Sequence, residues 1–159
     1  MELGLVYFPD NLPTLLDGLG VQASVTLLDG ETYDPVFDED NNIIARTTND
    51  MYGVSDTSYS IVLAYEKERF DARLSYVWRD DFKTGFNGCC SMPGGTWSAS
   101  EASMDFQLSY DVTDNMVVTF DATNITDEIY KGYYTDDYLY NNGASIFART
   151  YALGVRYSF

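Results

Sequence analysis

The sequence predicts an all-β protein made of antiparallel strands, and three observations lead to that fold class. Apolar and polar residues alternate with a period of two over most of the chain, which places them on opposite faces of extended strands. The spacing that marks an amphipathic helix is not sustained over any comparable length. Short polar segments, such as 66–69 and 111–115, separate neighbouring runs as hairpin turns do. At 159 residues the chain holds one domain, 1–159.

Seven strands are predicted in chain order from this alternation. The first, Glu2–Phe8, is short enough to be partial. The other six are 21–28, 57–66, 69–80, 102–112, 115–124 and 149–159. In strand 69–80, Asp71 and Arg73 belong to the polar set. In strand 57–66, Val62 is an apolar residue among the polar positions. The apolar sets of the six strands are Val21, Ala23, Val25, Leu27; Tyr59, Ile61, Leu63, Tyr65; Phe70, Ala72, Leu74, Tyr76, Trp78; Met104, Phe106, Leu108, Tyr110, Val112; Met116, Val118, Phe120, Ala122; and Tyr151, Leu153, Val155, Tyr157, Phe159.

The predicted connections are of two kinds, which alternate along the second half of the chain. The two turns named above are short, whereas the spans 29–57, 80–103 and 125–149 each exceed 20 residues. Loops of that length are rare in compact domains unless they serve a function. These three spans hold 15 acidic and four basic residues, so −11 of the formal charge of −16 resides in them. The connection 9–19 lies on the short-turn side but is longer, which departs from the pattern.

Composition argues against several classes of function. With 25 acids against 9 bases, no nucleic-acid partner is expected, because phosphate recognition needs clustered Lys and Arg. No run of 18 apolar residues predicts a membrane-spanning helix. His is absent, which removes the usual general base and the commonest transition-metal ligand, so we expect no enzyme, cofactor or metal site. Residues 1–5 lack the basic and apolar regions of an export signal, which we expect to be missing here.

The aromatic residues of the apolar face gather toward the ends of the predicted strands. Tyr65 and Phe70 lie near a short turn, and Tyr59 and Trp78 lie near the long spans. Outer-membrane barrels have two such aromatic belts, with short turns on one side and long loops on the other. Strands cross lipid only in closed rings, and bacterial rings have even strand numbers, so seven strands predict a piece of a larger barrel. The alternatives are a complete eight-stranded barrel, with an extra strand such as Asn42–Arg46, and a soluble β-sandwich.

Motifs toward the end of the chain carry a family resemblance. Residues 117–128 include Asn124-Ile125-Thr126-Asp127, and residues 149–159 read Arg-Thr-Tyr-Ala-Leu-Gly-Val-Arg-Tyr-Ser-Phe. The strand that ends in Trp78-Arg79-Asp80 carries the same resemblance. Over nearly its whole length, the chain resembles the C-terminal β-barrel portion of a TonB-dependent outer-membrane receptor. Ala148-Arg149 stands where that family usually has Gly-Arg.

The resemblance implies an antiparallel, up-and-down transmembrane segment of about seven strands from a barrel of about 22 strands in the bacterial outer membrane. Such a receptor imports iron–siderophore complexes, cobalamin or oligosaccharides, and it is energised by the TonB–ExbB–ExbD system through a plug domain. We expect the plug domain to be absent from these residues. The implied partners are outer-membrane lipid, the barrel-assembly machinery, the TonB–ExbB–ExbD system and a small-molecule nutrient. The alternative function is a complete small barrel with a structural or adhesive role.

The resemblance also implies where a nutrient binds, because substrate contacts in this family come largely from extracellular loops. The candidates are aromatic residues of the long spans, namely Trp97, Tyr133, Tyr134, Tyr138 and Tyr140. Tyr-rich loops can stack on sugars or catecholates, and they can equally pack on neighbouring loops. Tyr157 and Phe159 resemble the C-terminal signal that the barrel-assembly machinery reads, and they also suit a lipid-facing position.

Three further groups have both a functional and a structural interpretation. Adjacent Cys89 and Cys90 predict either a strained disulfide or thiols that are free or paired elsewhere. The acidic run 38–42 lacks the Gly and Glu that a calcium loop needs, so a solvated loop is favoured. Arginines on the polar face are expected to form ion pairs along a barrel wall rather than to contact a ligand. These are Arg73, Arg79 and Arg156, with Asp71, Asp105, Asp111 or Asp121 as expected partners.

Overall fold

The computed structural model describes residues 1–85, 95–134 and 140–159, and these contain thirteen strands and no helix. The strands pair antiparallel throughout, so the predicted all-β antiparallel class is confirmed. In the described part of the chain, no helix is long and apolar enough to cross a membrane. Cys89, Cys90 and Tyr138 lie outside the described residues.

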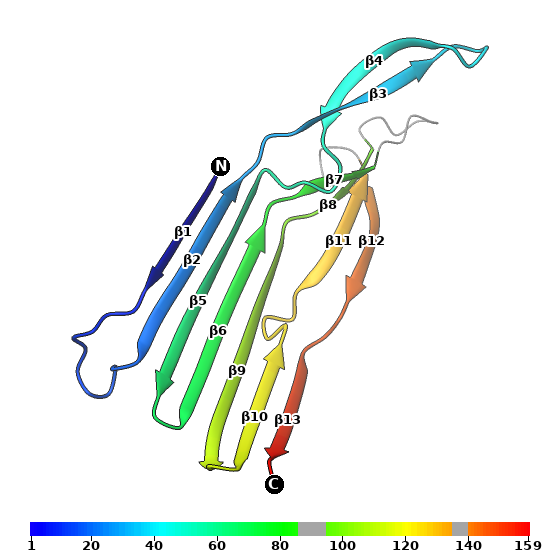
Figure 1. The fold of residues 1–159 in the computed structure, drawn as a ribbon. Coiled ribbons are helices and arrows are strands. Elements are labelled where there is room, and N and C mark those ends of the chain that lie inside the picture. The colour runs from blue at the N-terminus through cyan, green and yellow to red at the C-terminus, as the bar shows by residue number, and fades with distance from the viewer. Residues whose placement is uncertain (86–94, 135–139) are drawn as a thin grey trace.

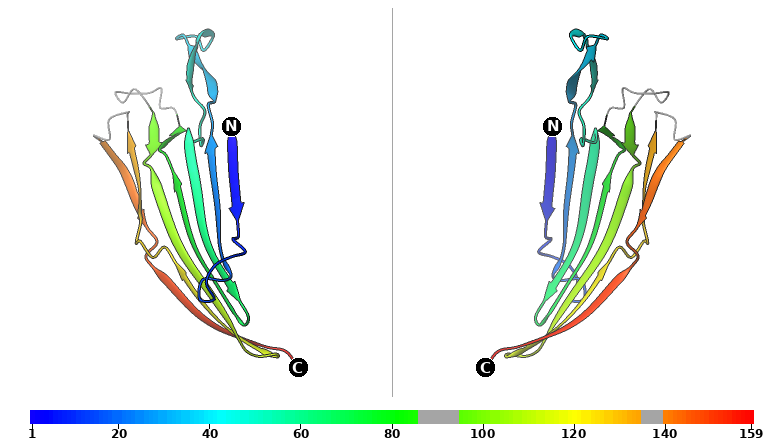
Figure 2. Two further views of the ribbon diagram at one scale, coloured as in Figure 1. Left: turned by 90° about the vertical axis from the view of Figure 1, so that its left-hand side faces the viewer. Right: turned by 90° about the vertical axis from the view of Figure 1, so that its right-hand side faces the viewer.

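The largest unit is a seven-stranded sheet that forms a single curved layer (Figures 1 and 2). Its strand order is β1–β2–β5–β6–β9–β10–β13, so strands follow one another across the sheet in chain order. The strands are β1 (Glu2–Tyr7), β2 (Leu19–Leu27), β5 (Thr57–Lys67), β6 (Phe70–Arg79), β9 (Glu101–Thr113), β10 (Met116–Thr123) and β13 (Thr150–Tyr157). These are the seven predicted strands, with ends that differ by one or two residues.

The register of this sheet aligns apolar residues with apolar residues across all seven strands. One row of directly paired residues is Tyr7, Val21, Leu63, Leu74, Phe106, Ala122 and Tyr151. Residues opposite each other in register share a face of the sheet, so the alternation in sequence becomes a continuous apolar face. On the other face the hydroxyls of Ser24 and Ser60, also paired, form a hydrogen bond of 2.8 Å.

The three long spans are not the loops that the sequence predicted, because each contains hairpin strands. β3 (Glu31–Phe37) and β4 (Ile43–Asp50) form a separate two-stranded ribbon. The four-stranded sheet has the order β12–β11–β8–β7, with β7 (Phe82–Gly85), β8 (Thr96–Ser98), β11 (Ile129–Tyr134) and β12 (Tyr140–Ile146). The candidate eighth strand, Asn42–Arg46, falls largely in β4, but β4 pairs only with β3. β7 and β8 are only four and three residues long, and β3 and β4 are exposed over most of their length, so none of them shows the sustained alternation that a pattern-based prediction needs.

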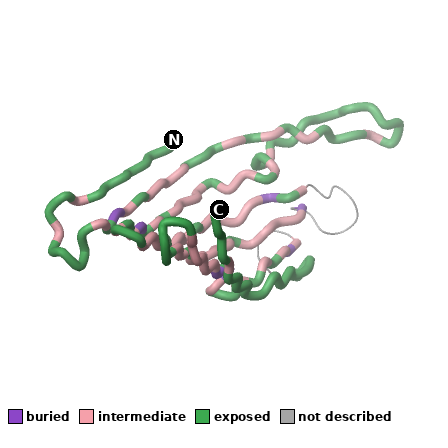
Figure 3. The backbone as a smooth tube through the Cα atoms, turned by 60° about the horizontal axis from the view of Figure 1, so that its bottom comes forward, coloured by how far each residue is buried: buried purple, intermediate pink, exposed green. Residues whose placement is uncertain are grey.

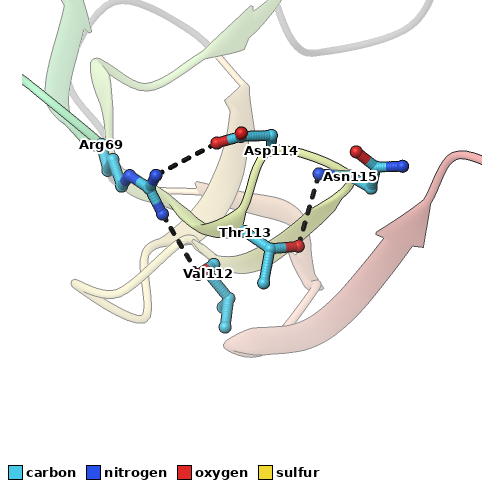
Figure 4. Close-up of polar contacts among 5 residues, drawn as sticks. All are labelled: Arg69, Val112, Thr113, Asp114 and Asn115. Carbon is cyan, nitrogen blue, oxygen red and sulfur yellow. Dashed lines mark hydrogen bonds and ion pairs between the residues drawn. The ribbon is translucent and has the colours of Figure 1, made fainter.

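The short-turn end of the sheet matches the prediction, with tight β5–β6 and β9–β10 connections. Figure 4 shows Arg69 of the first turn reaching across to the second, where Nη1 donates to the Val112 carbonyl at 3.3 Å. Its Nη2 lies 3.0 Å from the Asp114 carboxylate, and the Asn115 N–H donates to Thr113 Oγ1 at 3.3 Å. The two neighbouring hairpins are therefore tied together at their tips.

Ion pairs on the polar face agree with the sequence prediction only in part. Arg73 contacts Asp71 at 3.8 Å, as expected, and Glu66 at 3.1 Å. Arg79 pairs with Glu101 at 2.5 Å instead of with an expected Asp, because these two residues lie directly opposite each other in register. Within the described residues, no ion pair of Arg156 is found.

The described residues contain almost no core. Ala64, Ala122 and Tyr133 are the buried apolar residues among them, and most of the tube in Figure 3 is half-buried or exposed. Leu5 and Leu153 on the apolar face are 58% and 76% exposed. No second sheet covers the seven-stranded one in the described part, as a β-sandwich would require. No described sheet closes into a barrel either, and β1 and β13 are the two open edges of the seven-stranded sheet.

Candidate functional site

The three hairpin spans lie at the end of the main sheet opposite to the short turns (Figure 1), and they contain a row of aligned side chains. Lys83 on β7, Trp97 on β8 and Tyr133 on β11 are successive partners in register. The rings of Trp97 and Tyr133 stack with centroids 6.2 Å apart and planes 14° apart. Lys83 Nζ lies 5.9 Å from the centroid of the Trp97 ring, within the range of a cation–π contact. Two residues singled out from the sequence are therefore direct neighbours.

Lys83 connects this row to the β3–β4 ribbon. Its residue exposure is 5%, and Nζ donates to Asn49 Oδ1 at 2.9 Å. Asn49 Nδ2 in turn donates to Asp34 Oδ2 at 2.6 Å. A buried ammonium is tolerated only where polar groups replace its water, and this amide is one such group. The bonds form a continuous chain from the four-stranded sheet into the ribbon.

Tyr52 closes the other side of this chain of hydrogen bonds. Its hydroxyl donates to Asp34 Oδ2 at 2.5 Å. Burial of the hydroxyl, together with this hydrogen bond to a carboxylate, raises the pKa of Tyr52 to about 12. Tyr52 therefore stays protonated at neutral pH and keeps donating to Asp34. We call Asp34, Asn49, Tyr52 and Lys83 the anchor network.

Tyr133 is held at both its ring and its hydroxyl. The hydroxyl donates to Asp81 Oδ2 at 2.7 Å, and the residue is buried. Its ring packs against Trp97, which belongs to a different hairpin. These contacts correspond to the packing role that the sequence analysis set beside ligand stacking.

Two cavities flank this row, and Trp97 lines both. The first, about 250 Å³, has the carboxylates of Asp50, Asp56, Asp80 and Asp81 in its lining. The second, about 350 Å³, is lined by hydroxyl, amide and aromatic groups that include Ser98, Tyr130, Asn142 and Ser145. Such linings suit hydrogen bonding to polar, hydroxyl-rich groups. With no His in the sequence, neither cavity has the usual base of an acid–base or nucleophilic catalyst.

Of the other predicted contact residues, Tyr134 and Tyr140 do not join the Trp97–Tyr133 stack. Tyr134 and Tyr140 are register partners on β11 and β12, and Tyr140 is exposed. Adjacent strand residues point to opposite faces, so Tyr134 faces away from Tyr133. Tyr138 belongs to the part of the chain outside the description.

The Asn-Ile-Thr-Asp motif forms a turn directly after β10, which ends at Thr123. Asn124 has φ of 52° and is buried. Its Oδ1 accepts the Glu128 N–H at 2.9 Å, and its Nδ2 donates to the Ala148 carbonyl at 3.2 Å. The Asn124 N–H donates to Asp105 Oδ1 at 2.8 Å. The motif therefore joins the end of β10 to β9 and to the segment that enters β13.

The remaining predicted sites lie at the two extremes of the molecule. Tyr157 is the last residue of the edge strand β13, and its ring meets that of Phe159 edge-on with centroids 5.2 Å apart. In the ribbon tip, Asp38 Oδ1 accepts the N–H groups of Asp40 at 3.0 Å and Asn42 at 2.8 Å. The Asn42 N–H is the main group that lowers the pKa of Asp38. The acidic run is thus a turn closed by its own main chain.

Sequence reasoning missed the anchor network and Asp81. The available signal was charge: Lys83 is one of only four bases in spans that hold 15 acids. A cation in that setting is expected to have polar or acidic partners, although the sequence does not name them. Asn49 and Asp34 gave no signal because they stand among many exposed polar residues.

No protein-family model, no curated protein and no solved structure matches this chain. The features of the molecule that bear on function are the two faces of the main sheet, its open edges and the contacts within the hairpins. The apolar face is the most informative of these, because its exposure needs a physical explanation.

Proposed function

We propose that this chain forms part of the wall of a TonB-dependent receptor, a transporter of the bacterial outer membrane. The observation that carries the proposal is a continuous apolar face across seven hydrogen-bonded strands that nothing in the described chain covers. Exposed apolar surfaces of this extent mark contact with a protein, a ligand or a membrane. Lipid can cover the whole face, since strands that alternate apolar and polar residues are the spanning elements of outer-membrane barrels.

The aromatic side chains of the apolar face support a lipid setting. Toward the hairpins, Tyr59 stacks on Trp78 with centroids 5.1 Å apart and lies 6.1 Å from Tyr76. Toward the short turns, Tyr65 meets Phe70 edge-on at 5.9 Å. Tyr and Trp are enriched where the bilayer meets water, because their rings are apolar and their tips are polar. The two groups lie where aromatic belts would flank a lipid-facing band.

The open edges support a larger ring. β1 and β13 each have a neighbour on one side only. Within lipid, unpaired main-chain groups carry a penalty of several kcal/mol each, so the edges need further strands. A barrel of about 22 strands would supply them. Tyr157 and Phe159, on and just beyond β13, would be the signal for the barrel-assembly machinery.

Transport in this proposal needs parts beyond the described strands. A plug domain would couple the barrel to the TonB–ExbB–ExbD system, and the small-molecule nutrient would be an iron–siderophore complex, cobalamin or an oligosaccharide. The hairpin end, with Trp97 and its two cavities, would face the outside and contact that nutrient. A complete eight-stranded barrel with a structural or adhesive role has less support, because β4 does not join the main sheet.

Lipid contact can be tested with the two tryptophans, which lie on different parts of the fold. In the protein inserted into vesicles, a Trp97→Phe variant reports on Trp78 of the apolar face, and a Trp78→Phe variant reports on Trp97. We expect lipids brominated near the headgroup to quench Trp78 and to leave Trp97 largely unquenched. Equal quenching of the two, or no quenching of Trp78, would contradict lipid contact.

The larger ring can be tested in the gene. An open reading frame that continues upstream of Met1 with further strands, a plug domain and an export signal would support the receptor. A stop codon, or an export signal alone, directly upstream would favour the small barrel and remove the import function.

A further inference from the structure

The β3–β4 ribbon projects beyond the main sheet and pairs with no other strand in the described chain (Figures 1 and 2). An isolated two-stranded hairpin is at best marginally stable in water. At its base, the anchor network holds this ribbon to β7 through Lys83 and Asn49. Farther out, Tyr33 and Ile44 are 64% and 63% exposed. The ribbon is therefore a fixed but uncovered element.

The two outer edges of the ribbon are not equivalent. The Met51 N–H donates to the Gly30 carbonyl at 2.9 Å, which makes that pair a hydrogen-bonded one. Hydrogen-bonded and non-hydrogen-bonded pairs alternate in antiparallel ladders, so Tyr33–Thr48 and Pro35–Arg46 are non-hydrogen-bonded pairs. Their main-chain groups point away from the partner strand.

Pro35 has no N–H, so the outer edge of β3 lacks a donor at its centre. The outer edge of β4 keeps the N–H and C=O groups of Arg46 and Thr48, and no strand of the described residues lies beside it. An extended segment can therefore pair with β4 and is hindered from pairing with β3.

Charge selects the kind of segment. Residues 29–51 contain seven carboxylates and one base, Arg46. A second copy of the ribbon would bring like charges together, and phosphate groups would be repelled in the same way. A cationic partner would be attracted, and its apolar side chains could contact Ile44, which is exposed on β4.

We propose that the outer edge of β4 binds an extended, cationic and partly apolar polypeptide segment of another protein as a third strand. The main-chain groups of Arg46 and Thr48 supply the pairing, and the carboxylates of the ribbon attract the segment. Arg46 and Thr48 line neither of the two cavities, and this binding does not depend on transport.

The test measures binding of a fluorescent peptide of alternating Lys and Val to the protein as cells produce it, kept in detergent micelles. Thr48→Pro removes one outward N–H, whereas Thr48→Val changes the side chain and keeps that N–H. We expect Thr48→Pro to weaken binding about tenfold or more and Thr48→Val to change it less than about twofold. Pro35→Thr should leave the affinity equal or higher, because it restores a donor on β3.

Two control peptides separate strand pairing from charge. A Glu–Val peptide should not bind, and a Lys–Val peptide with N-methyl groups along one edge should bind weakly if at all. Equal binding of the N-methylated peptide, or equal affinity of the Pro and Val variants at position 48, would mean that charge alone holds the peptide and would overturn the proposal.

Self-association of the chain that Thr48→Pro abolishes would assign the edge to a second copy. Slow hydrogen exchange of the Arg46 and Thr48 amides without peptide would mean that the edge is already covered, which also overturns it.

Discussion

Asn124 shows how one side chain organises the end of a strand. Its left-handed backbone, with φ of 52°, is a conformation that Asn and Gly adopt far more readily than other residues. Its amide group accepts from one main-chain N–H and donates to one main-chain carbonyl, on residues four and 24 positions away. Gly and Ala have no carboxamide, so neither of them can make these two hydrogen bonds. The backbone conformation and the two hydrogen bonds thus explain why Asn is the first residue of the Asn-Ile-Thr-Asp motif.

We expect Asn124→Ala to speed hydrogen exchange of the Glu128 amide by about tenfold or more. The substitution removes a buried acceptor and places Ala in a left-handed conformation, each worth about 1–2 kcal/mol. Asn124→Gly is the matched control, because Gly adopts the left-handed backbone readily but lacks the two side-chain hydrogen bonds. Hydrogen exchange of the Glu128 amide should speed up less in this variant than in the Ala variant. Unchanged exchange in the Ala variant would show that the turn does not depend on this side chain.

At the scale of elements, the β3–β4 ribbon is positioned by polar contacts instead of by a core. The anchor network connects the ribbon, the β4–β5 connection and β7 through three hydrogen bonds of 2.5–2.9 Å. Two of these bonds converge on one oxygen of Asp34. The orientation of the ribbon should therefore be sensitive to the protonation of its donors.

The anchor network gives the ribbon a specific dependence on alkaline pH. The pKa of Tyr52 in the folded state, about 12, lies above its ordinary value of 10.0. A raised pKa of this kind means that the folded state holds the proton more tightly. The contribution of Tyr52 to stability is therefore complete below pH 10 and is lost as the pH rises toward 12. We expect protection of the ribbon amides from hydrogen exchange to fall in that interval.

Tyrosinate absorbance provides the matched measurement. Subtracting the titration of Tyr52→Phe from that of the wild type should give a midpoint near 12. A Tyr52 midpoint at the ordinary value would mean that the hydrogen bond to Asp34 is not maintained in solution.

The largest part of the described chain is an open seven-stranded sheet with two unlike faces, and the described residues have little interior. Its apolar residues form continuous rows, yet few are buried, and both edge strands carry unpaired main-chain groups. Such edges are templates for pairing with further strands. A sheet of this shape is suited to be one sector of a ring surrounded by lipid, in line with the proposed function.

We expect residues 1–159 alone, refolded in detergent, to aggregate and to lack the sharp, heat-modifiable electrophoretic band of a closed barrel. The reason is that the edges of β1 and β13 have no partners within the described chain. A small barrel known to refold in the same detergent is the control for the procedure. A monodisperse folded monomer with such a band would contradict the proposal that the chain is one sector of a larger ring, and it would support a closed small barrel.

The main sheet was predictable from sequence, and the hairpins were not, for one physical reason. Strands such as Phe70–Arg79 and Met116–Thr123 separate two environments, so their residues must alternate. Thr96–Ser98 is too short to show a period, and Ile43–Asp50 is exposed over most of its length, so neither strand carries such an alternation. Trp97 and Tyr133 could be chosen as aromatic residues of long spans, but their stacking depends on a register between β8 and β11 that no local pattern encodes.

The sequence by itself determined the seven strands, their two faces and the sorting of short and long connections. Each of these follows from local alternation and turn chemistry, which act between residues close in the chain. Only the tertiary structure decided that the long spans are hairpins, that Arg79 pairs with Glu101, and that Lys83 joins the ribbon to the four-stranded sheet. The two side-chain contacts join residues 22 and 34 positions apart, and all three features depend on strand register, which a single sequence does not specify.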